Sequence, residues 1–218
     1  MISFEISTKK LWSVVYTTGV FLAILTLMIG MGMTESIDRN ILLFLEGLRT
    51  PIGNDLFLII TYLGSAAFVF IAMFCFGIIL LIKNKSEEIL LLIGTVAGSS
   101  ALVFALKEII GRLRPSSLLS VYTETSFSFP SGHTNISVVF YGVLAYILAQ
   151  SYTDEKTRAT ILLGWIFFMI IIGFSRMYLG VHYASDIFGG YALGFFTLSL
   201  GIILFEKYFD TKKHFKKI

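Results

Sequence analysis

Residues 175–186 read Ser-Arg-Met-Tyr-Leu-Gly-Val-His-Tyr-Ala-Ser-Asp and lie between two long apolar runs. Charged side chains are costly in such surroundings, yet Arg176, His182 and Asp186 all occur within this stretch. His182 and Asp186 are four residues apart, so on a helix they would share one face and touch. One interpretation is a buried polar cluster that ties two helices together. The other is a functional site, because ionisable groups among membrane-spanning segments are functional by default.

The three charged residues of this stretch suit one kind of chemistry. A carboxylate that holds one imidazole nitrogen fixes the tautomer and leaves the other nitrogen free as a nucleophile. Asp186 can act in this way on His182. Arg176 offers a planar set of donors that matches phosphate. The stretch therefore predicts a nucleophilic histidine next to a phosphate-binding arginine.

The composition indicates an integral membrane protein. Of the 218 residues, 56% are hydrophobic and only 14% are charged, whereas soluble domains carry about 25% charge. The mean hydropathy is +0.84. We expect one membrane-embedded domain over residues 1–218, with its functional core in 107–186. Neither a Cys/His cluster nor a pair of carboxylates with metal-ligand spacing occurs, so we expect no metal and no cofactor.

Six apolar stretches are long enough to cross a bilayer, because a spanning helix needs about 20 apolar residues. The sequence therefore predicts an all-α fold, a bundle of six transmembrane helices joined by short connectors. The predicted spans are 11–33, 55–82, 88–110, 132–150, 159–178 and 183–206.

The basic residues predict the orientation of this bundle. Eleven of the 17 Lys and Arg residues fall on one side of a six-span layout, and positive charge marks the cytoplasmic side. Both termini are therefore expected in the cytoplasm, and the stretch 175–186 is expected near the outer face. The eleven residues are Lys9, Lys10, Lys83, Lys85, Lys156, Arg158, Lys207, Lys212, Lys213, Lys216 and Lys217.

The first outer connector, residues 34–54, has the pattern of an amphipathic helix lying in the membrane interface. Its charged residues, Asp38, Arg39, Glu46 and Arg49, fall largely away from the apolar face. The helix either borders a lipid entrance or only packs on the bundle. The apolar face is predicted to comprise Ile37, Ile41, Leu42, Phe44, Leu45 and Leu48.

A second polar segment follows the third predicted span. Lys107 and Arg114 are seven residues apart, and Gly111 and Pro115 predict that the helix ends between them. Lys107, Arg112 and Arg114 are then expected at the outer membrane surface. Alone, they could be interfacial anchors whose long side chains reach toward water.

A third polar segment, Phe-Pro-Ser-Gly-His-Thr at 129–134, opens the fourth predicted span. Free N–H groups at a helix start favour an anion, and Gly132 lets the backbone approach it closely. Ser131 adds a hydroxyl, although serine is also an ordinary N-cap residue. His133 adds a group that can carry a proton near neutral pH.

The three segments together predict an anion-binding site with a nucleophile and an acid. In this order and spacing they resemble the type 2 phosphatidic acid phosphatase family, in its bacterial membrane lipid-phosphatase branch. The match holds at every defining position of the family motifs. Those positions are Lys107, Arg114 and Pro115; Pro130, Ser131, Gly132 and His133; and Ser175, Arg176, His182 and Asp186.

The resemblance implies a six-helix core, metal-free hydrolysis through a phosphohistidine, and an active site on the outer side of the cytoplasmic membrane. His182 would be the nucleophile, Asp186 would orient it, and His133 would be the general acid and base. Five further motif residues would bind the substrate phosphate: Lys107, Arg114, Ser131, Gly132 and Arg176.

The expected partners are membrane lipids and a phospholipid or polyprenyl phosphate substrate. Nothing in the sequence indicates a nucleic acid or protein partner. Phosphatidylglycerophosphate is the preferred substrate, and undecaprenyl diphosphate, phosphatidic acid and diacylglycerol diphosphate are alternatives. A transporter would place its charges mid-span, and a structural membrane protein would not need both histidines. Vanadium-dependent haloperoxidases share the motifs but are soluble.

Overall fold

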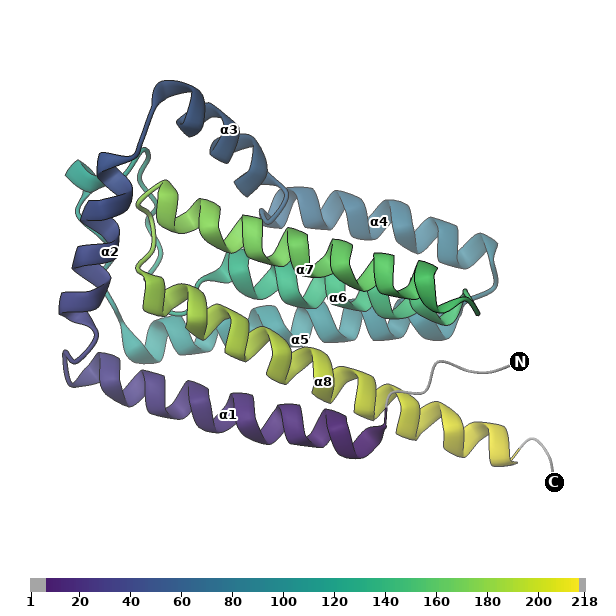
Figure 1. The fold of residues 1–218 in the computed structure, drawn as a ribbon. Helices are drawn as coiled ribbons and strands as arrows, with labels where there is room; N and C mark the ends of the chain where they lie inside the picture. The colour runs from purple at the N-terminus through teal and green to yellow at the C-terminus, as the bar shows by residue number, and fades with distance from the viewer. Residues whose placement is uncertain (1–6, 216–218) are drawn as a thin grey trace.

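The computed structural model describes the backbone of residues 7–215 and the side chains of residues 7–209. Over this range the regular structure is helical, which confirms the all-α prediction. Most of the helices lie side by side in a bundle (Figure 1). They are α1 (Thr8–Gly30), α2 (Glu35–Gly47), α3 (Pro51–Tyr62), α4 (Ala66–Ile82), α5 (Ser86–Ile110), α6 (Gly132–Gln150), α7 (Glu155–Tyr178) and α8 (Ala184–Phe215), with a 3-10 turn η1 (Ser117–Leu119).

Five of the described helices, α1, α5, α6, α7 and α8, are each long and apolar enough to span a membrane, and α3 with α4 forms a sixth, bent span. Helix α6 begins and ends where the sequence predicts. Helix α8 continues beyond the predicted end at residue 206, because no glycine or proline interrupts residues 202–215.

The single helix predicted over 55–82 is wrong. The chain breaks between α3 and α4 and bends by 45°. Ser65 caps the new helix, since its hydroxyl accepts a hydrogen bond from the Phe68 N–H at 3.2 Å. At Gly64 a Cβ atom would lie only 2.7 Å from Ile172 of α7. Glycine at the break therefore allows α7 to approach closely.

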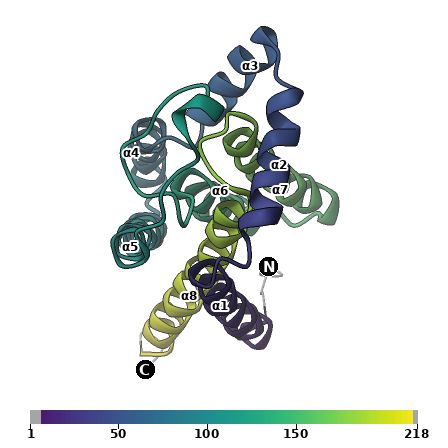
Figure 2. The ribbon, with the colours of Figure 1, turned by 90° about the vertical axis from the view of Figure 1, so that its left-hand side faces the viewer.

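Helix α6 forms the centre of the bundle, with α4, α5, α7 and α8 around it (Figure 2). Its side chains Val138, Val139, Phe140 and Val143 are buried. Ser131 precedes the helix as its N-cap. The N-terminus of the central helix therefore lies at the end of the bundle where the polar segments gather.

The two ends of the bundle differ. The start of α1, the described end of α8 and the short connectors α4–α5 and α6–α7 lie at one end (Figure 1). Helix α2 crosses the other end, where the connectors 111–131 and 179–183 also lie. The basic residues at positions 9, 10, 83, 85, 156, 158 and 207 belong to the first end, and those at 212, 213, 216 and 217 lie outside the described side chains.

The predicted amphipathic helix in 34–54 exists as α2, but its buried face is only partly the predicted one. Asp38 is buried together with Leu42 and Leu45, whereas Ile37 and Phe44 are exposed. The expectation that Asp38 points away from the packed face is therefore wrong. The physical reason is that Asp38 finds charged and polar partners on the bundle, described below.

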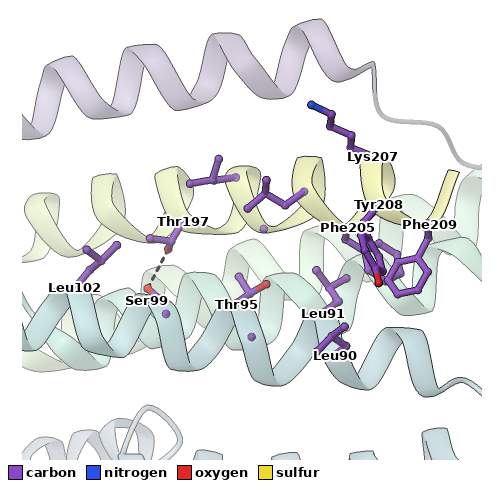
Figure 3. A pocket seen from close by; sticks show the side chains of 15 residues that line it. Leu90, Leu91, Thr95, Ser99, Leu102, Thr197, Phe205, Lys207, Tyr208 and Phe209 are labelled. Atoms are coloured by element: carbon purple, nitrogen blue, oxygen red, sulfur yellow. Dashed lines mark hydrogen bonds between the residues drawn. The ribbon is translucent and has the colours of Figure 1, made fainter. Parts of the chain in front are cut away.

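A groove of about 950 Å³ lies between α5 and α8, toward the end where α1 starts (Figure 3). Its walls are mostly apolar and include Leu91, Phe205 and Tyr208. The hydroxyls of Ser99 and Thr197 are hydrogen-bonded to each other at 2.9 Å. None of the predicted site residues is among the described residues that line this groove, so the candidate chemistry lies elsewhere.

Candidate active site

The connector 111–131 begins with a sharp turn that folds it over the end of the bundle. Helix α5 ends at Gly111, which has the left-handed φ of 62° and donates its N–H to the Lys107 carbonyl at 2.9 Å. The predicted end of this helix is thus confirmed. Farther on, the Ser128 N–H donates to the Arg112 carbonyl at 2.8 Å, which closes the connector into a loop.

The connector 179–183 also needs a glycine. Gly180 has a φ of +73°, and a Cβ atom there would lie 2.1 Å from the Leu119 carbonyl oxygen. The turn lets the two connectors pair, as the Val121 N–H donates to the Leu179 carbonyl at 2.9 Å. Close packing of these connectors holds His182 at the end of the bundle.

His182 and Asp186 meet, but they do not share a helical face as predicted. Helix α8 begins at Ala184, so His182 precedes it. His182 Nδ1 nevertheless lies 3.4 Å from Asp186 Oδ2. Asp186 also accepts a hydrogen bond from the Tyr183 N–H at 2.8 Å, which folds the first turn of α8 back toward the histidine.

The hydrogen bonds around His182 indicate its tautomer. Its Nε2 atom lies 3.1 Å from Nη1 of Arg114, and a guanidinium can only donate. Nε2 therefore carries the lone pair and Nδ1 carries the proton. The Ser128 hydroxyl donates to Asp186 Oδ2 at 2.5 Å and lies 3.3 Å from His182 Nδ1, so it supports both residues.

His182 is unprotonated at neutral pH. Burial lowers the pKa of its imidazole to about 4, and the neighbouring Asp186 carboxylate only partly opposes this effect. The side chain is 1% exposed. A neutral imidazole with its Nε2 lone pair directed at a cationic site has the protonation state that nucleophilic attack on phosphorus requires.

Arg114 and Arg176 form the cationic site, and Glu124 lies between them. One carboxylate oxygen of Glu124 is 2.5 Å from Arg114, and the other is paired with Arg176, which is completely buried. Burial raises the pKa of Glu124, but Arg176 and Arg114 lower it by more, to about 2. The two arginines thus already hold an anion, which a phosphate bound to both would displace.

Lys107 and Ser131 lie in the same region but make other contacts. The Lys107 ammonium donates to the Phe127 carbonyl of the folded connector. Ser131 is fully buried, and its hydroxyl accepts from the Thr134 N–H at 3.4 Å as the N-cap of α6. The Ser131 N–H donates to the Asp186 carbonyl at 3.0 Å, which joins the second and third motifs. Binding of phosphate by Lys107 and Ser131 stays a prediction.

Gly132 and His133 line a cleft of about 390 Å³ that reaches from α6 to α4 and α5. The rest of its wall is mostly apolar and includes Val69, Phe70 and Ile136. Phe70 is 75% exposed, so the cleft is bordered by the outer surface of the bundle. His133 therefore lies between the polar end of the bundle and the apolar cleft, which opens toward the side of the bundle.

Four residues around the site were not among the site residues predicted from the sequence: Asp38, Arg112, Glu124 and Ser128. Arg112 was expected at the outer membrane surface, where it could have been an interfacial anchor. Arg112 instead pairs with Asp186 at 2.6 Å and with Asp38 at 2.7 Å. An arginine among apolar helices requires a carboxylate partner. This requirement was the available signal that Arg112 forms a buried ion pair. No local spacing indicates which carboxylates lie within its reach.

The fold is that of an integral membrane protein, and the polar end of its bundle brings His182, Arg114 and Arg176 together. Residues 88–210 match the PAP2 superfamily, which is more than half of the chain. The protein belongs to this superfamily.

Two curated relatives are similar to this chain over most of its length. Phosphatidylglycerophosphatase B of Bacillus subtilis is 34% identical over 203 residues, which cover 90% of this chain and 95% of the relative. A lipid A 4'-phosphatase of Porphyromonas gingivalis is 28% identical over 187 residues, which cover 79% of this chain and 73% of that protein.

Two crystal structures are similar to this fold. The transmembrane PAP2-type phosphatidylglycerolphosphate phosphatase from Bacillus subtilis superposes with a TM-score of 0.82 at 30% identity and covers 91% of this chain and 96% of that one. LpxE of Aquifex aeolicus superposes with a TM-score of 0.61 at 25% identity and covers 76% of this chain and 94% of that one. The six-span architecture is therefore that of a membrane PAP2 protein.

Proposed function

We propose that this protein is a membrane lipid phosphatase that hydrolyses phosphatidylglycerophosphate to phosphatidylglycerol at the outer face of the cytoplasmic membrane. The neutral His182, with Nε2 directed at Arg114, is the observation that carries the proposal. The likeness to phosphatidylglycerophosphatase B, over nearly the whole length of both chains, supports the choice of substrate.

The first chemical step transfers the phosphoryl group to the enzyme. The phosphate displaces Glu124 from Arg114 and Arg176, whose donors stabilise the charge that develops in the transition state. His182 Nε2 forms a bond to phosphorus as the bond to the glycerol oxygen breaks. His133 gives its proton to the departing alkoxide. Asp186 stabilises the positive charge that appears on the His182 ring.

The second step releases phosphate. Water attacks phosphorus and the P–N bond breaks, which returns the lone pair to His182 Nε2. His133, now neutral, takes a proton from the attacking water and is ready for the next turnover. The residues present suffice for both steps, and among the described residues no group of three or more His, Cys, Asp or Glu side chains could hold a metal ion.

The apolar cleft beside His133 supports a lipid substrate. It is open toward the side of the bundle, where acyl chains surround a membrane protein. A lipid with its phosphate between Arg114 and Arg176 could place the start of its tails in this cleft. Proximity of the cleft to the general acid fits a leaving group that carries the tails.

Comparison of four lipids in detergent tests the choice of substrate. We expect kcat/KM for phosphatidylglycerophosphate to exceed that for undecaprenyl diphosphate, phosphatidic acid and diacylglycerol diphosphate by about tenfold or more. Contacts in a binding pocket can supply discrimination of this size. His182→Ala protein corrects for contaminating phosphatases. Turnover should persist in EDTA and stop with vanadate. A higher kcat/KM for undecaprenyl diphosphate would make that lipid the substrate instead. Loss of activity in EDTA would overturn the metal-free mechanism.

Cysteine labelling tests the proposed sidedness. In a Cys75→Ser background, Leu118→Cys should react with an impermeant maleimide on intact cells, because Leu118 is 90% exposed at the active-site end. Ser151→Cys, in the α6–α7 connector, should react only after the membrane is permeabilised. The opposite labelling pattern would place the active site in the cytoplasm.

A further inference from the structure

A row of alternating charges connects the interfacial helix α2 to the catalytic pair. Arg112 lies in the middle, with Nη2 at 2.7 Å from Asp38 Oδ2 and Nη1 at 2.6 Å from Asp186 Oδ1. The side chains of Asp38 and Asp186 are 3% and 0% exposed, and that of Arg112 is 12% exposed. Asp186 in turn faces His182, so the order is carboxylate, guanidinium, carboxylate and imidazole.

Asp38 also holds the start of helix α8. Its Oδ1 accepts the Ser185 N–H at 2.9 Å, and its Oδ2 accepts the Ser185 hydroxyl at 2.6 Å. Helix N-termini have free N–H groups, and a carboxylate from elsewhere can satisfy them as a cap residue does. Helix α2 is therefore fastened to the turn of α8 that carries Asp186.

The two oxygens of Asp186 have separate partners. Oδ1 receives Arg112, whereas Oδ2 receives Ser128, the Tyr183 N–H and His182. The guanidinium is fixed from the other side, since it stacks over the Tyr183 ring at 4.5 Å. Loss of Arg112 would leave Oδ1 of a buried carboxylate without its charged partner, which favours protonation or rotation of Asp186.

We propose that Arg112 and Asp38 are positioning residues of the reaction, which keep the Asp186 carboxylate turned toward His182. Helix α2 then contributes to catalysis through this contact. Arg112 occupies Oδ1 of Asp186, so Oδ2 stays directed at Nδ1 of His182 and can stabilise the imidazolium of the phosphoenzyme step. Arg112 acts through Asp186 and makes no described contact to Arg114, Arg176 or Glu124. The proposal rests on the phosphohistidine mechanism above.

Kinetics of single variants separate this role from phosphate binding. Arg112→Ala should lower kcat by about 10- to 100-fold, the loss found when the hydrogen-bonding partner of a metal-ligating side chain is removed. KM and the inhibition constant for vanadate should stay within about twofold, because the phosphate-binding arginines are intact. Arg112→Lys should recover only part of kcat, since an ammonium cannot bridge both carboxylates as the planar fork does. Arg39→Ala, on the exposed side of α2, is the matched control and should behave as wild type.

A double-mutant cycle with Asp186→Asn then separates positioning from a general structural role. In the Asp186→Asn background, Arg112→Ala should cause little further loss of kcat on an activated aryl phosphate. Asp38→Asn keeps the size of the side chain and should lower kcat several-fold. In the Asp186→Asn background this substitution should also cause little further loss. It provides the same test if the Arg112→Ala protein does not fold.

Two outcomes would overturn the proposal. Losses that multiply in the double variants would make Arg112 and Asp38 purely structural. A vanadate inhibition constant that rises as much as kcat falls would make Arg112 a phosphate ligand. A phosphoenzyme trapped on His182 of the wild type shows that the mechanism holds, so failure of the cycle then counts against the positioning role alone.

Discussion

His182→Ala should abolish turnover and leave no phosphoenzyme to trap. His182 is the imidazole that has a carboxylate at Nδ1 and a cationic site at Nε2, at 3.4 Å from Asp186 and 3.1 Å from Arg114. Its lowered pKa of about 4 keeps it neutral at the pH of the assay. Removal of the ring removes the atom that bonds to phosphorus, and no neighbouring side chain can replace it in this position.

Asp186→Asn gives a graded version of the same test. The amide is as large as the carboxylate but cannot stabilise the imidazolium, so turnover should fall by about 10²- to 10⁴-fold, as for other oriented histidines. Substrate should still bind, because the phosphate-binding arginines are unchanged. A loss of affinity comparable to the loss of kcat would show that Asp186 holds the whole site together rather than His182 alone.

Rapid mixing with ³²P-labelled substrate, quenched without acid, identifies the phosphorylated residue. Acid is avoided because the P–N bond of phosphohistidine is labile. Peptide mapping should place the label on His182. Label on His133, or a phosphoenzyme in the His182→Ala protein, would reverse the assignment of nucleophile and acid.

His133→Ala should have the second largest effect, and its size should depend on the leaving group. A lipid alkoxide needs a proton as the P–O bond breaks, so kcat for the lipid should fall by about 10²- to 10⁴-fold. An activated aryl phosphate leaves without a proton, so its first step should be nearly unaffected. Release of phosphate from His182 should nevertheless be slow, because no base activates the water.

A pre-steady-state burst with the aryl substrate would reveal this change of rate-limiting step. The His133→Ala protein should release about one aryl alcohol per site rapidly and then turn over slowly, with phosphoenzyme accumulating. Gly64→Ala is unsuitable as a control, since it would crowd both Ile172 and His133. Arg39→Ala serves instead. Equal losses on both substrates without a burst would assign His133 a role in binding rather than in proton transfer.

The bent second span and the buried face of α2 show where local patterns mislead. The stretch 55–82 is apolar on average, so its hydropathy cannot reveal that Ser65 caps a new helix. Asp38 was assigned to the polar side of its helix because charge normally faces water. It lies buried because Arg112 and Ser185 compensate its charge and its hydrogen bonds. Periodicity reports the average environment of a helix face and not the exceptions that partners permit.

The sequence by itself determined the class of fold and indicated the family of the protein. Apolar runs of sufficient length specify spanning helices, because every backbone polar group must be satisfied within the membrane. The histidines, the cations and their spacing indicated an anion-binding site with a nucleophile and an acid, and phosphoryl transfer followed from their resemblance to the type 2 phosphatidic acid phosphatase family.

Only the tertiary structure decided which charges meet. Arg112 lies 74 residues from each of its two carboxylates, and Glu124 reaches Arg176 over 52 residues. Such pairs depend on how the connectors fold over the end of the bundle, with Gly111 and Gly180 in left-handed turns. Local preference acts over a few residues, whereas a buried charge is satisfied by whichever opposite charge the fold brings within about 3 Å.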